Sequence, residues 1–252
     1  MELGTVILLY NNLTGSLPPS LFHSRSLSLF DLSRNRFSGE LPENMGSATT
    51  IMILILAENS FSGKIPISIT NISRLLLMDL SKNRLSGTIP VFDPTSFLAI
   101  TRELPNLISE MSILRSLNLR NNSPQGSVPC SISNSSNLQI LDLSHNNFTG
   151  SIPAEIGNLV GMFETPTTFS SISFMFTFSI EYTDLIVNWM RSVQGLSPSV
   201  SINIYSWLDL SKNRLSGEIS PCLSNLRGLK MPTSLTMALK WKFQQLLGIR
   251  RA

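Results

Sequence analysis

The sequence has very little cysteine and histidine. The two cysteines are Cys130 and Cys222, and the two histidines are His23 and His145. None of the four stands in the spacing of a zinc motif, so we expect no metal site and no cofactor. Charged residues are also scarce, at 14% of the chain, and Ser and Asn hold many of the remaining polar positions. That composition is more typical of a secreted protein than of a cytosolic enzyme.

The sequence also lacks a hydrophobic run long enough to cross a membrane. The best candidate, residues 169–180, is about 12 residues long and contains four serines and a threonine, whereas a span needs roughly 18 to 20 apolar residues. The opening stretch MELGTVILLYNNL looks superficially like a secretion signal, but Leu3, Val6 and Leu8 already follow the repeat described below. We therefore expect neither a signal peptide nor a transmembrane helix in these residues.

Positive charge is concentrated at one end of the chain. The formal net charge is +3, but the stretch from Lys230 to Ala252 holds five basic residues and no acidic one. The rest has 14 basic and 16 acidic residues, so the body of the protein has no electrostatic footprint for nucleic acid, and no such partner is expected. The five basic residues are Lys230, Lys240, Lys242, Arg250 and Arg251.

What the sequence does contain is a repeat. The nine residues DLSKNRLSG occur at Asp79–Gly87 and again at Asp209–Gly217. In this unit, apolar residues stand eight, five and three positions before an Asn, and an apolar residue, a Gly, another apolar residue and a Pro follow it. The first four such Asn are evenly spaced, and the longer gaps before Asn122 and before Asn213 indicate two interruptions. The seven units are centred on Asn11, Asn35, Asn59, Asn83, Asn122, Asn146 and Asn213.

Each fixed position of the unit has a physical reason. The alternating apolar residues before the Asn have the period of a short strand, whose inward side chains meet those of neighbouring units. The Asn stands where the chain leaves the strand, so its amide can satisfy buried backbone groups of adjacent coils and form a ladder. Gly permits the tight path that follows, and Pro ends the next extended piece without needing a donor. One unit buries little, so the units are expected to stack around a continuous core.

The unit LxxLxLxxNxLxGxIP closely resembles the leucine-rich repeats of plant extracellular receptors. The resemblance implies an α/β leucine-rich-repeat solenoid built from 24-residue plant-type repeats. It would be curved and right-handed, with a parallel β-sheet on its concave face. Plant proteins with this repeat recognise other molecules through the surface of the solenoid, so the resemblance also favours a binding function over catalysis.

The two interruptions divide the chain. We expect residues 1–153 to form repeats with a short insertion around 91–113, residues 154–204 to form an island, and residues 205–230 to resume the repeats. The segment Glu181 to Ile219 resembles the junction in plant receptor-like proteins where an island interrupts the repeats. Those proteins carry leucine-rich repeats outside the cell and one membrane helix, with no kinase.

After about residue 230 the repeat is lost. Leu229 occupies the first position of a next unit, but Pro232 and Ser234 stand where the pattern requires leucine, and Met237 stands where it requires Asn. Residues 231–252 are therefore interpreted as an aberrant, non-repeat tail that arose from a frameshift or mis-splicing. The alternative is a basic amphipathic helix that touches a membrane.

The outward side chains that alternate with the buried leucines are the natural binding surface. One outward column belongs to the common LDLS motif of the repeat and is interpreted as structural: Asp31, Asp79, Asn118, Asp142 and Asp209. The column immediately before the ladder Asn varies in chemistry, and we interpret it as the ligand-binding column of the concave face; an ordinary solvated surface is the alternative. Its members are Tyr10, Arg34, Glu58, Lys82, Asn121, His145 and Lys212.

Five sequons for N-linked glycosylation occur in the chain. Two of them follow a ladder Asn at the same distance along the chain, which places them at the same convex position of two different repeats. These two, Asn71 and Asn134, are the best candidates. Several sequons arise by chance in a chain rich in Asn and Ser, and they have meaning only if the chain is secreted. The five acceptors predicted are Asn12, Asn71, Asn121, Asn134 and Asn147.

No catalytic constellation is present. His145 has Asp142 and Ser144 beside it, but these are repeat residues without the arrangement of nucleophile, base and orienting group. Cys130 and Cys222 follow the Pro position of units two steps apart. A disulfide needs α-carbons within about 7 Å, while each coil adds about 4.8 Å, so both cysteines are expected to be free or mispaired.

The resemblance gives the predicted function. The chain would be the extracellular ligand-recognition region of a plant receptor-like protein in defence or developmental signalling, located on the outer side of the plasma membrane. Its partners would be a peptide or protein ligand and co-receptor kinases with leucine-rich repeats. Membrane association would occur only through segments absent from this chain. Two alternatives remain, a soluble inhibitor of a microbial cell-wall-degrading enzyme and a non-functional receptor gene fragment.

Overall fold

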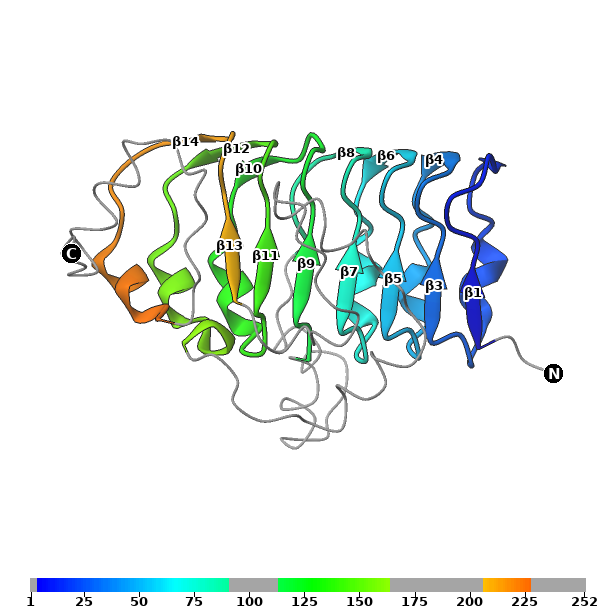
Figure 1. The fold of residues 1–252 in the computed structure, drawn as a ribbon, viewed down its shortest axis with the longest axis horizontal. Helices are drawn as coiled ribbons and strands as arrows, with labels where there is room; N and C mark the ends of the chain where they lie inside the picture. Colours follow the sequence, from blue (N-terminus) through cyan, green and yellow to red (C-terminus); the bar gives the residue numbers. More distant parts are fainter. Residues whose placement is uncertain (1–3, 91–112, 164–205, 228–252) are drawn as a thin grey trace, which may run out of the picture.

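A computed structural model describes residues 4–90, 113–163 and 206–227, and these residues form a stack of coils (Figure 1). The predicted leucine-rich-repeat solenoid is confirmed: every unit of the sequence repeat contributes one coil with one strand to a common parallel sheet. The greater part of the predicted insertion and of the island, and the whole of the tail 231–252, lie outside the described residues.

The main sheet has seven parallel strands in the order β1-β3-β5-β7-β9-β11-β13. Neighbouring strands pair in step, so that Phe30 stands opposite Leu54 and Leu54 opposite Met78. Strand β7 pairs directly with β9, and β11 with β13, so neither interruption of the repeat breaks the sheet. The strands are β1 (Thr5–Ile7), β3 (Leu29–Asp31), β5 (Ile53–Ile55), β7 (Leu77–Asp79), β9 (Ser116–Asn118), β11 (Ile140–Asp142) and β13 (Trp207–Asp209).

A second series of short strands follows each ladder Asn, in two parallel sheets along one edge of the stack (Figure 1). The repeat glycine lies in or just after each of these strands and has a positive φ; at Gly63 this angle is 74°, a region that L-residues with a side chain disfavour. A Cβ at Gly63 would also meet the side chain of Glu40 at 2.7 Å. The two sheets are β2 (Thr14–Gly15), β4 (Arg36–Glu40), β6 (Ser60–Lys64) and β8 (Arg84–Ser86), then β10 (Gln125–Ser127), β12 (Asn147–Gly150) and β14 (Arg214–Leu215).

The helical segments of the described residues are short 3-10 turns behind the main sheet. The Pro of the repeat suits the residue before or at the start of such a turn, because its φ is already fixed and it needs no backbone donor. Among the described residues, no helix has the length and apolar character needed to cross a bilayer. The turns are η1 (Pro19–His23), η2 (Met45–Ser47), η3 (Ile67–Asn71), η5 (Cys130–Asn134), η6 (Ala154–Asn158), η7 (Val160–Met162) and η9 (Pro221–Asn225).

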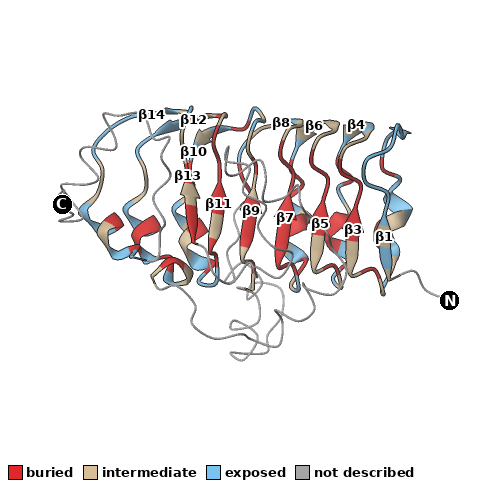
Figure 2. Ribbon diagram, viewed as in Figure 1, coloured by how far each residue is buried: buried red, intermediate tan, exposed pale blue. Residues whose placement is uncertain are grey.

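One continuous core runs through the stack (Figure 2). It contains the inward leucines of the strands and buried aromatic rings, including Phe22 and Phe30, whose ring centroids are 6.0 Å apart in an edge-to-face arrangement. A fully buried Leu contributes about 1.5 to 3 kcal/mol, so the core is the main source of stability. At β1 the corresponding residues are open to solvent: Leu8 is 43% exposed, whereas Leu56, at the same repeat position, is 0% exposed.

The sixth coil continues past the predicted start of the island. Residues 154–158 form η6, which corresponds to η5 and η9, and Ile156, Leu159 and Met162 are buried in the core. Residues 154–163 thus follow the fold of the other coils, while the rest of the predicted island, up to residue 204, lies outside the described residues. The apolar residues after Pro153 belong to the back of the repeat itself, which is why they carry no strand pattern.

Candidate functional site

The ladder asparagines join each coil to the coil before it. In the third coil, Asn59 Nδ2 donates to the carbonyl oxygens of Leu32 (3.0 Å) and Leu56 (3.2 Å), while its Oδ1 accepts from the backbone N–H of Phe37 (3.0 Å). One amide thus satisfies backbone groups of two coils, which would otherwise be buried without partners. The side chains that make such bonds between coils are Asn35, Asn59, Asn83, Asn122, Asn146 and Asn213.

Two ladder positions depart from this pattern for clear reasons. Asn146 Oδ1 accepts from the N–H of Asn122 (3.0 Å), because the residue two positions later is Pro124, which has no N–H. Asn11 Nδ2 donates only to carbonyls of its own coil, those of Leu8 and Leu9. The amide therefore adapts to the donor available, and its bonds between coils depend on the coil that precedes it.

The column predicted to bind ligand lies on a turn three residues beyond each strand rather than on the strand. All seven of its residues have a left-handed backbone, with φ between 52° and 57°, and they are the only non-glycine residues with positive φ in the described part of the chain. Where a following coil is described, the backbone N–H donates to it; the N–H of Glu58, for instance, donates to the oxygen of Ser81 at 2.9 Å. We call this set the turn row: Tyr10, Arg34, Glu58, Lys82, Asn121, His145 and Lys212.

The backbone of the turn row is fixed while its side chains vary. None of the seven is β-branched or proline, in keeping with the steric cost of a branched Cβ at a left-handed angle. Side chains therefore emerge at one spacing and direction from coil to coil. Tyr10 is 75% exposed, and Asn121 and Lys212 are exposed as well.

The first four side chains of the turn row contact one another. Arg34 lies over the ring of Tyr10, with 5.9 Å between its Cζ and the ring centroid. Glu58 lies between the two cations, with its carboxylate 3.6 Å from Arg34 Nε and 2.7 Å from Lys82 Nζ. Each such half-exposed pair contributes roughly 0 to 1 kcal/mol, so a ligand could exchange these contacts at low cost.

The Asp column predicted to be structural bonds to the backbone. Asp31 Oδ1 accepts from the N–H (2.8 Å) and hydroxyl (2.7 Å) of Ser33, and the same N–H contact recurs at Asp79, Asp142 and Asp209. At Asn118 the side-chain amide takes this role: its oxygen accepts from the N–H of Arg120, while its nitrogen donates to Asp79 Oδ2 at 3.2 Å.

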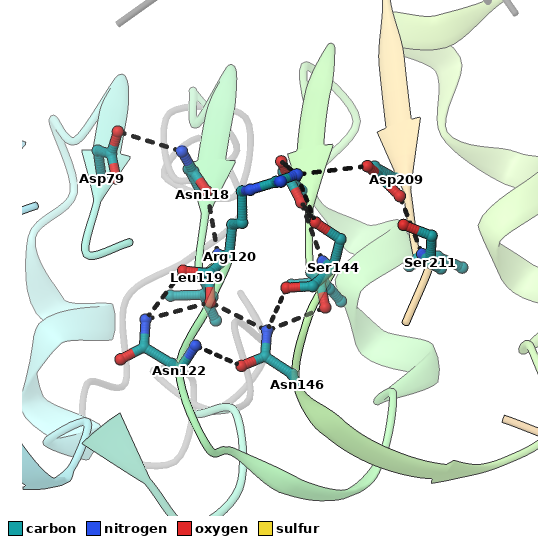
Figure 3. A network of polar contacts seen from close by, with 12 residues as sticks. Asp79, Asn118, Leu119, Arg120, Asn122, Ser144, Asn146, Asp209 and Ser211 are labelled. Atoms are coloured by element: carbon teal, nitrogen blue, oxygen red, sulfur yellow. Dashed lines mark hydrogen bonds and ion pairs between the residues drawn. The ribbon is translucent and has the colours of Figure 1, made fainter. Parts of the chain in front are cut away.

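Arg120 crosses three coils, and sequence reasoning missed it. Its Nη1 donates to Ser144 Oγ at 3.1 Å and lies 3.8 Å from the carboxylates of both Asp142 and Asp209 (Figure 3). The equivalent position holds Ser or Ala in the other coils from the second onward. The available signal was the fifth unit itself, which reads LNLR where the repeat usually has LDLS.

Burial controls the titration of this network. Burial, together with the charge of Asp209, raises the pKa of Asp142 to about 6 against the opposing hydrogen bonds of Ser144 and the charge of Arg120. Burial also raises the pKa of Asp79. His145 shows the reverse, because burial and the charges of Arg120 and Lys212 lower its pKa.

The other predicted positions fall in different places. Ser144 Oγ donates to Asp142 at 2.6 Å and accepts from Arg120, so this hydroxyl serves the network between coils. No group of three or more His, Cys, Asp or Glu in the described ranges is arranged to hold a metal ion. Cys130 and Cys222 are both exposed, free thiols.

The fold places the five sequons in different environments. Asn71 and Asn134 end the turns η3 and η5, and Asn12 is exposed just after the first ladder residue. Asn147 is half-buried in strand β12. Asn121 belongs to the turn row, where a glycan would cover the predicted ligand contacts, so its two predicted roles exclude each other in one molecule.

Comparison with known proteins agrees with the fold. The family model Leucine Rich Repeat matches residues 26–48, 137–159 and 206–226, while no curated protein sequence matches the chain. Among solved structures, the ectodomain of the Arabidopsis thaliana receptor kinase GASSHO1/SCHENGEN3 is 34% identical, covers 62% of this chain and 17% of its own, and has a TM-score of 0.54.

Two further receptors cover more of this chain. A TDR receptor is 27% identical over 90% of this chain and 29% of its own, with a TM-score of 0.63. The plant peptide hormone receptor RGFR1, solved with RGF2, is 26% identical over 90% of this chain and 31% of its own, with a TM-score of 0.55. The chain thus spans less than a third of the length of these receptors. The chain contains leucine-rich repeats, and its coils are similar to those of plant receptor ectodomains.

Proposed function

We propose that this chain recognises a peptide or protein ligand outside the cell, as part of a plant receptor-like protein in defence or development. The observation that carries the proposal is the turn row beside an unbroken seven-stranded sheet, in which one backbone geometry presents unlike side chains coil after coil. A row about 4.8 Å apart per coil suits an extended ligand that contacts several coils in succession.

The similar receptors support this function. GASSHO1/SCHENGEN3 was solved in complex with CASPARIAN STRIP INTEGRITY FACTOR 2, and RGFR1 with RGF2. The segment Glu181 to Ile219 resembles the junction of receptor-like proteins without a kinase, so we propose that signalling passes to partner receptor kinases at the plasma membrane. The turn row contributes ligand contacts, with Lys82, Asn121 and Lys212 the residues to test first.

Photo-crosslinking would test the binding face. A photoreactive amino acid is placed at Lys82 or Lys212 in the turn row, and at Ile67 or Val160 as controls, since these two are 61% and 57% exposed on the back turns. Each protein is exposed to the peptide fraction of plant extracellular fluid, irradiated and analysed by mass spectrometry. We expect a discrete peptide adduct from the row positions alone. Equal adducts from both faces, or none specific to the row, would contradict the proposed binding face.

A further inference from the structure

The last residue of the back turn occupies the same surface position in four of the coils. It is the C-terminal residue of η3, η5, η6 and η9, and in all four it is an exposed asparagine. Only two of these asparagines are followed by the Ser that completes a sequon, because Val160 and Arg227 stand at that place in the other two. We call the set the back column: Asn71, Asn134, Asn158 and Asn225.

The local structure directs Asn71 and Asn134 to solvent. The residues after them point inward, with Ile72 4% exposed and Ser135 5% exposed. The preceding 3-10 turn closes through the N–H of Ile72 or Ser135, not through the Asn side chain. Because both asparagines are exposed, a bulky group on either Nδ2 would extend into solvent rather than into the core.

We propose that Asn71 and Asn134 carry N-linked glycans and that the back column is the glycan-bearing face of the protein. In the transfer, the Asn Nδ2 forms a bond to C1 of the first sugar of a lipid-pyrophosphate-linked oligosaccharide. The bond from that C1 to the pyrophosphate oxygen breaks, the lipid pyrophosphate leaves with the electron pair, and Nδ2 loses one proton. Glycans there leave the turn row, on the other side of the coils, uncovered.

The remaining sequons are less suited to carry a glycan in the folded protein. Asn147 is half-buried in β12, where its N–H donates to the oxygen of Pro124 and its strand pairs with β10 on one side and β14 on the other. Strands on both sides restrict the space for a sugar at Asn147. Asn12 and Asn121 are exposed, but they lie at or beside the turn row, so a glycan there would compete with the proposed ligand contacts.

Site mapping in a secretory cell tests the proposal. The full chain is expressed behind a cleavable secretion leader, and both secreted and membrane-retained protein are treated with a peptide N-glycosidase in heavy-oxygen water, which marks each formerly glycosylated Asn. We expect the mark at Asn71 and Asn134 and none at Asn147. Ser73→Ala and Ser136→Ala should each remove one glycan, with Asn71→Gln and Asn134→Gln as second variants.

A variant with an additional sequon in the back column provides a matched test. Val160→Thr creates a sequon at Asn158 on an exposed side chain, so it should add one glycan without disturbing the core. Protein that carries no mark at Asn71 and Asn134 would overturn the proposal, whether or not it is secreted. A mark at Asn147 in folded, secreted protein would contradict the claim that the flanking strands prevent glycosylation at this half-buried residue. Neither outcome bears on whether the turn row binds a ligand.

Discussion

At the scale of single residues, the turn row separates backbone geometry from side-chain chemistry. All seven positions adopt nearly the same left-handed angle although they carry aromatic, acidic, basic and amide side chains. A left-handed angle costs an ordinary L-residue roughly 1 to 2 kcal/mol, less for Asn and none for Gly. The row therefore tolerates many residues but selects against a branched Cβ.

Substitution at Asn121 tests this selection. Asn121 is exposed, and only its backbone N–H is fixed, by a bond of 3.0 Å to the oxygen of Ser144. Asn121→Gly should change the free energy of unfolding little, whereas Asn121→Val should lower it by about 1 to 2 kcal/mol. Urea unfolding measures both. Gln125→Val, on an exposed position of strand β10, is the control and should be nearly neutral; an equal loss in Gln125→Val and Asn121→Val would refute the backbone explanation.

Residue roles differed in how far the sequence could predict them. The ladder Asn recurs in each unit and has one local purpose, so its position could be predicted without a structure. Arg120 could not be interpreted in the same way, because Asp209 lies beyond the second interruption and reaches it only when the seventh coil stacks on the sixth. The left-handed angle of the turn row also has no sequence marker, since glycine never occupies it.

At the scale of elements, the network around Arg120 links the coils on both sides of the second interruption. The coils of β9, β11 and β13 contribute Arg120, Asp142 and Asp209 in turn, and one guanidinium lies 3.8 Å from both carboxylates. Burial raises the pKa of Asp142, and repulsion from Asp209, which shares the same cation, adds to the effect. Coil-to-coil stability in this region should therefore depend on pH.

The sign of that dependence follows from Asp142. Its pKa is about 6 in the folded protein and near 3.8 when unfolded, so the folded state retains the proton to higher pH. The stabilisation is complete below pH 3.8 and is lost as the pH rises through 6; a shift of this size corresponds to about 3 kcal/mol. Asp142→Asn, which keeps an acceptor for Ser144, should remove the part of this stabilisation that changes between pH 4.5 and 7.5, about 2 kcal/mol, from the unfolding curves.

Other titrating groups change the stability of both the wild type and Asp142→Asn with pH. The pKa of Asp79 is raised as well. The lowered pKa of His145 has the opposite effect, since its stabilisation is present above pH 6.5 and is lost as the pH falls through the lowered folded value. The informative quantity is therefore the difference between wild type and Asp142→Asn at each pH. Parallel stability curves for the two proteins would show that Asp142 has an ordinary pKa.

At the scale of the whole molecule, stability comes from contacts between neighbouring coils. A coil inside the stack has a partner on each side, and its leucines are fully buried, as Leu56 and Leu141 are. The coil of β1 pairs on one side only within the described residues, and Leu8 and Leu13 are 43% and 38% exposed. Such quasi-linear stacks gain most of their stability from nearest-neighbour interfaces.

The same ladder substitution at two places should therefore have different effects. Asn146→Ala removes bonds to the oxygens of Leu119 and Leu143 and to the N–H of Asn122, at a residue only 7% exposed. It should lower the free energy of unfolding by about 2 to 4 kcal/mol, because several buried groups lose their partners. Asn11→Ala, at an exposed residue whose side-chain bonds stay inside its own coil, should cost less than about 1 kcal/mol. Similar losses in calorimetry would contradict a stack stabilised between coils.

The fold was largely predictable because each coil repeats one local solution. Apolar spacing, the ladder Asn, Gly and Pro together specify the strand, the turn and the return of one unit, and stacking follows from the exposed apolar faces. The end of the sixth coil was not predictable in detail, since Ile156 and Leu159 resemble any apolar sequence once the strand period has ended.

The left-handed turn row also makes this solenoid a convenient scaffold for building binding libraries. Its seven sites are displayed by one repeated backbone angle and lie outside the leucine core, so a library can vary all of them together. In a library whose codons omit valine, isoleucine, threonine and proline, most members should fold. In an unrestricted library, many members would have a strained backbone at one or more of the seven sites.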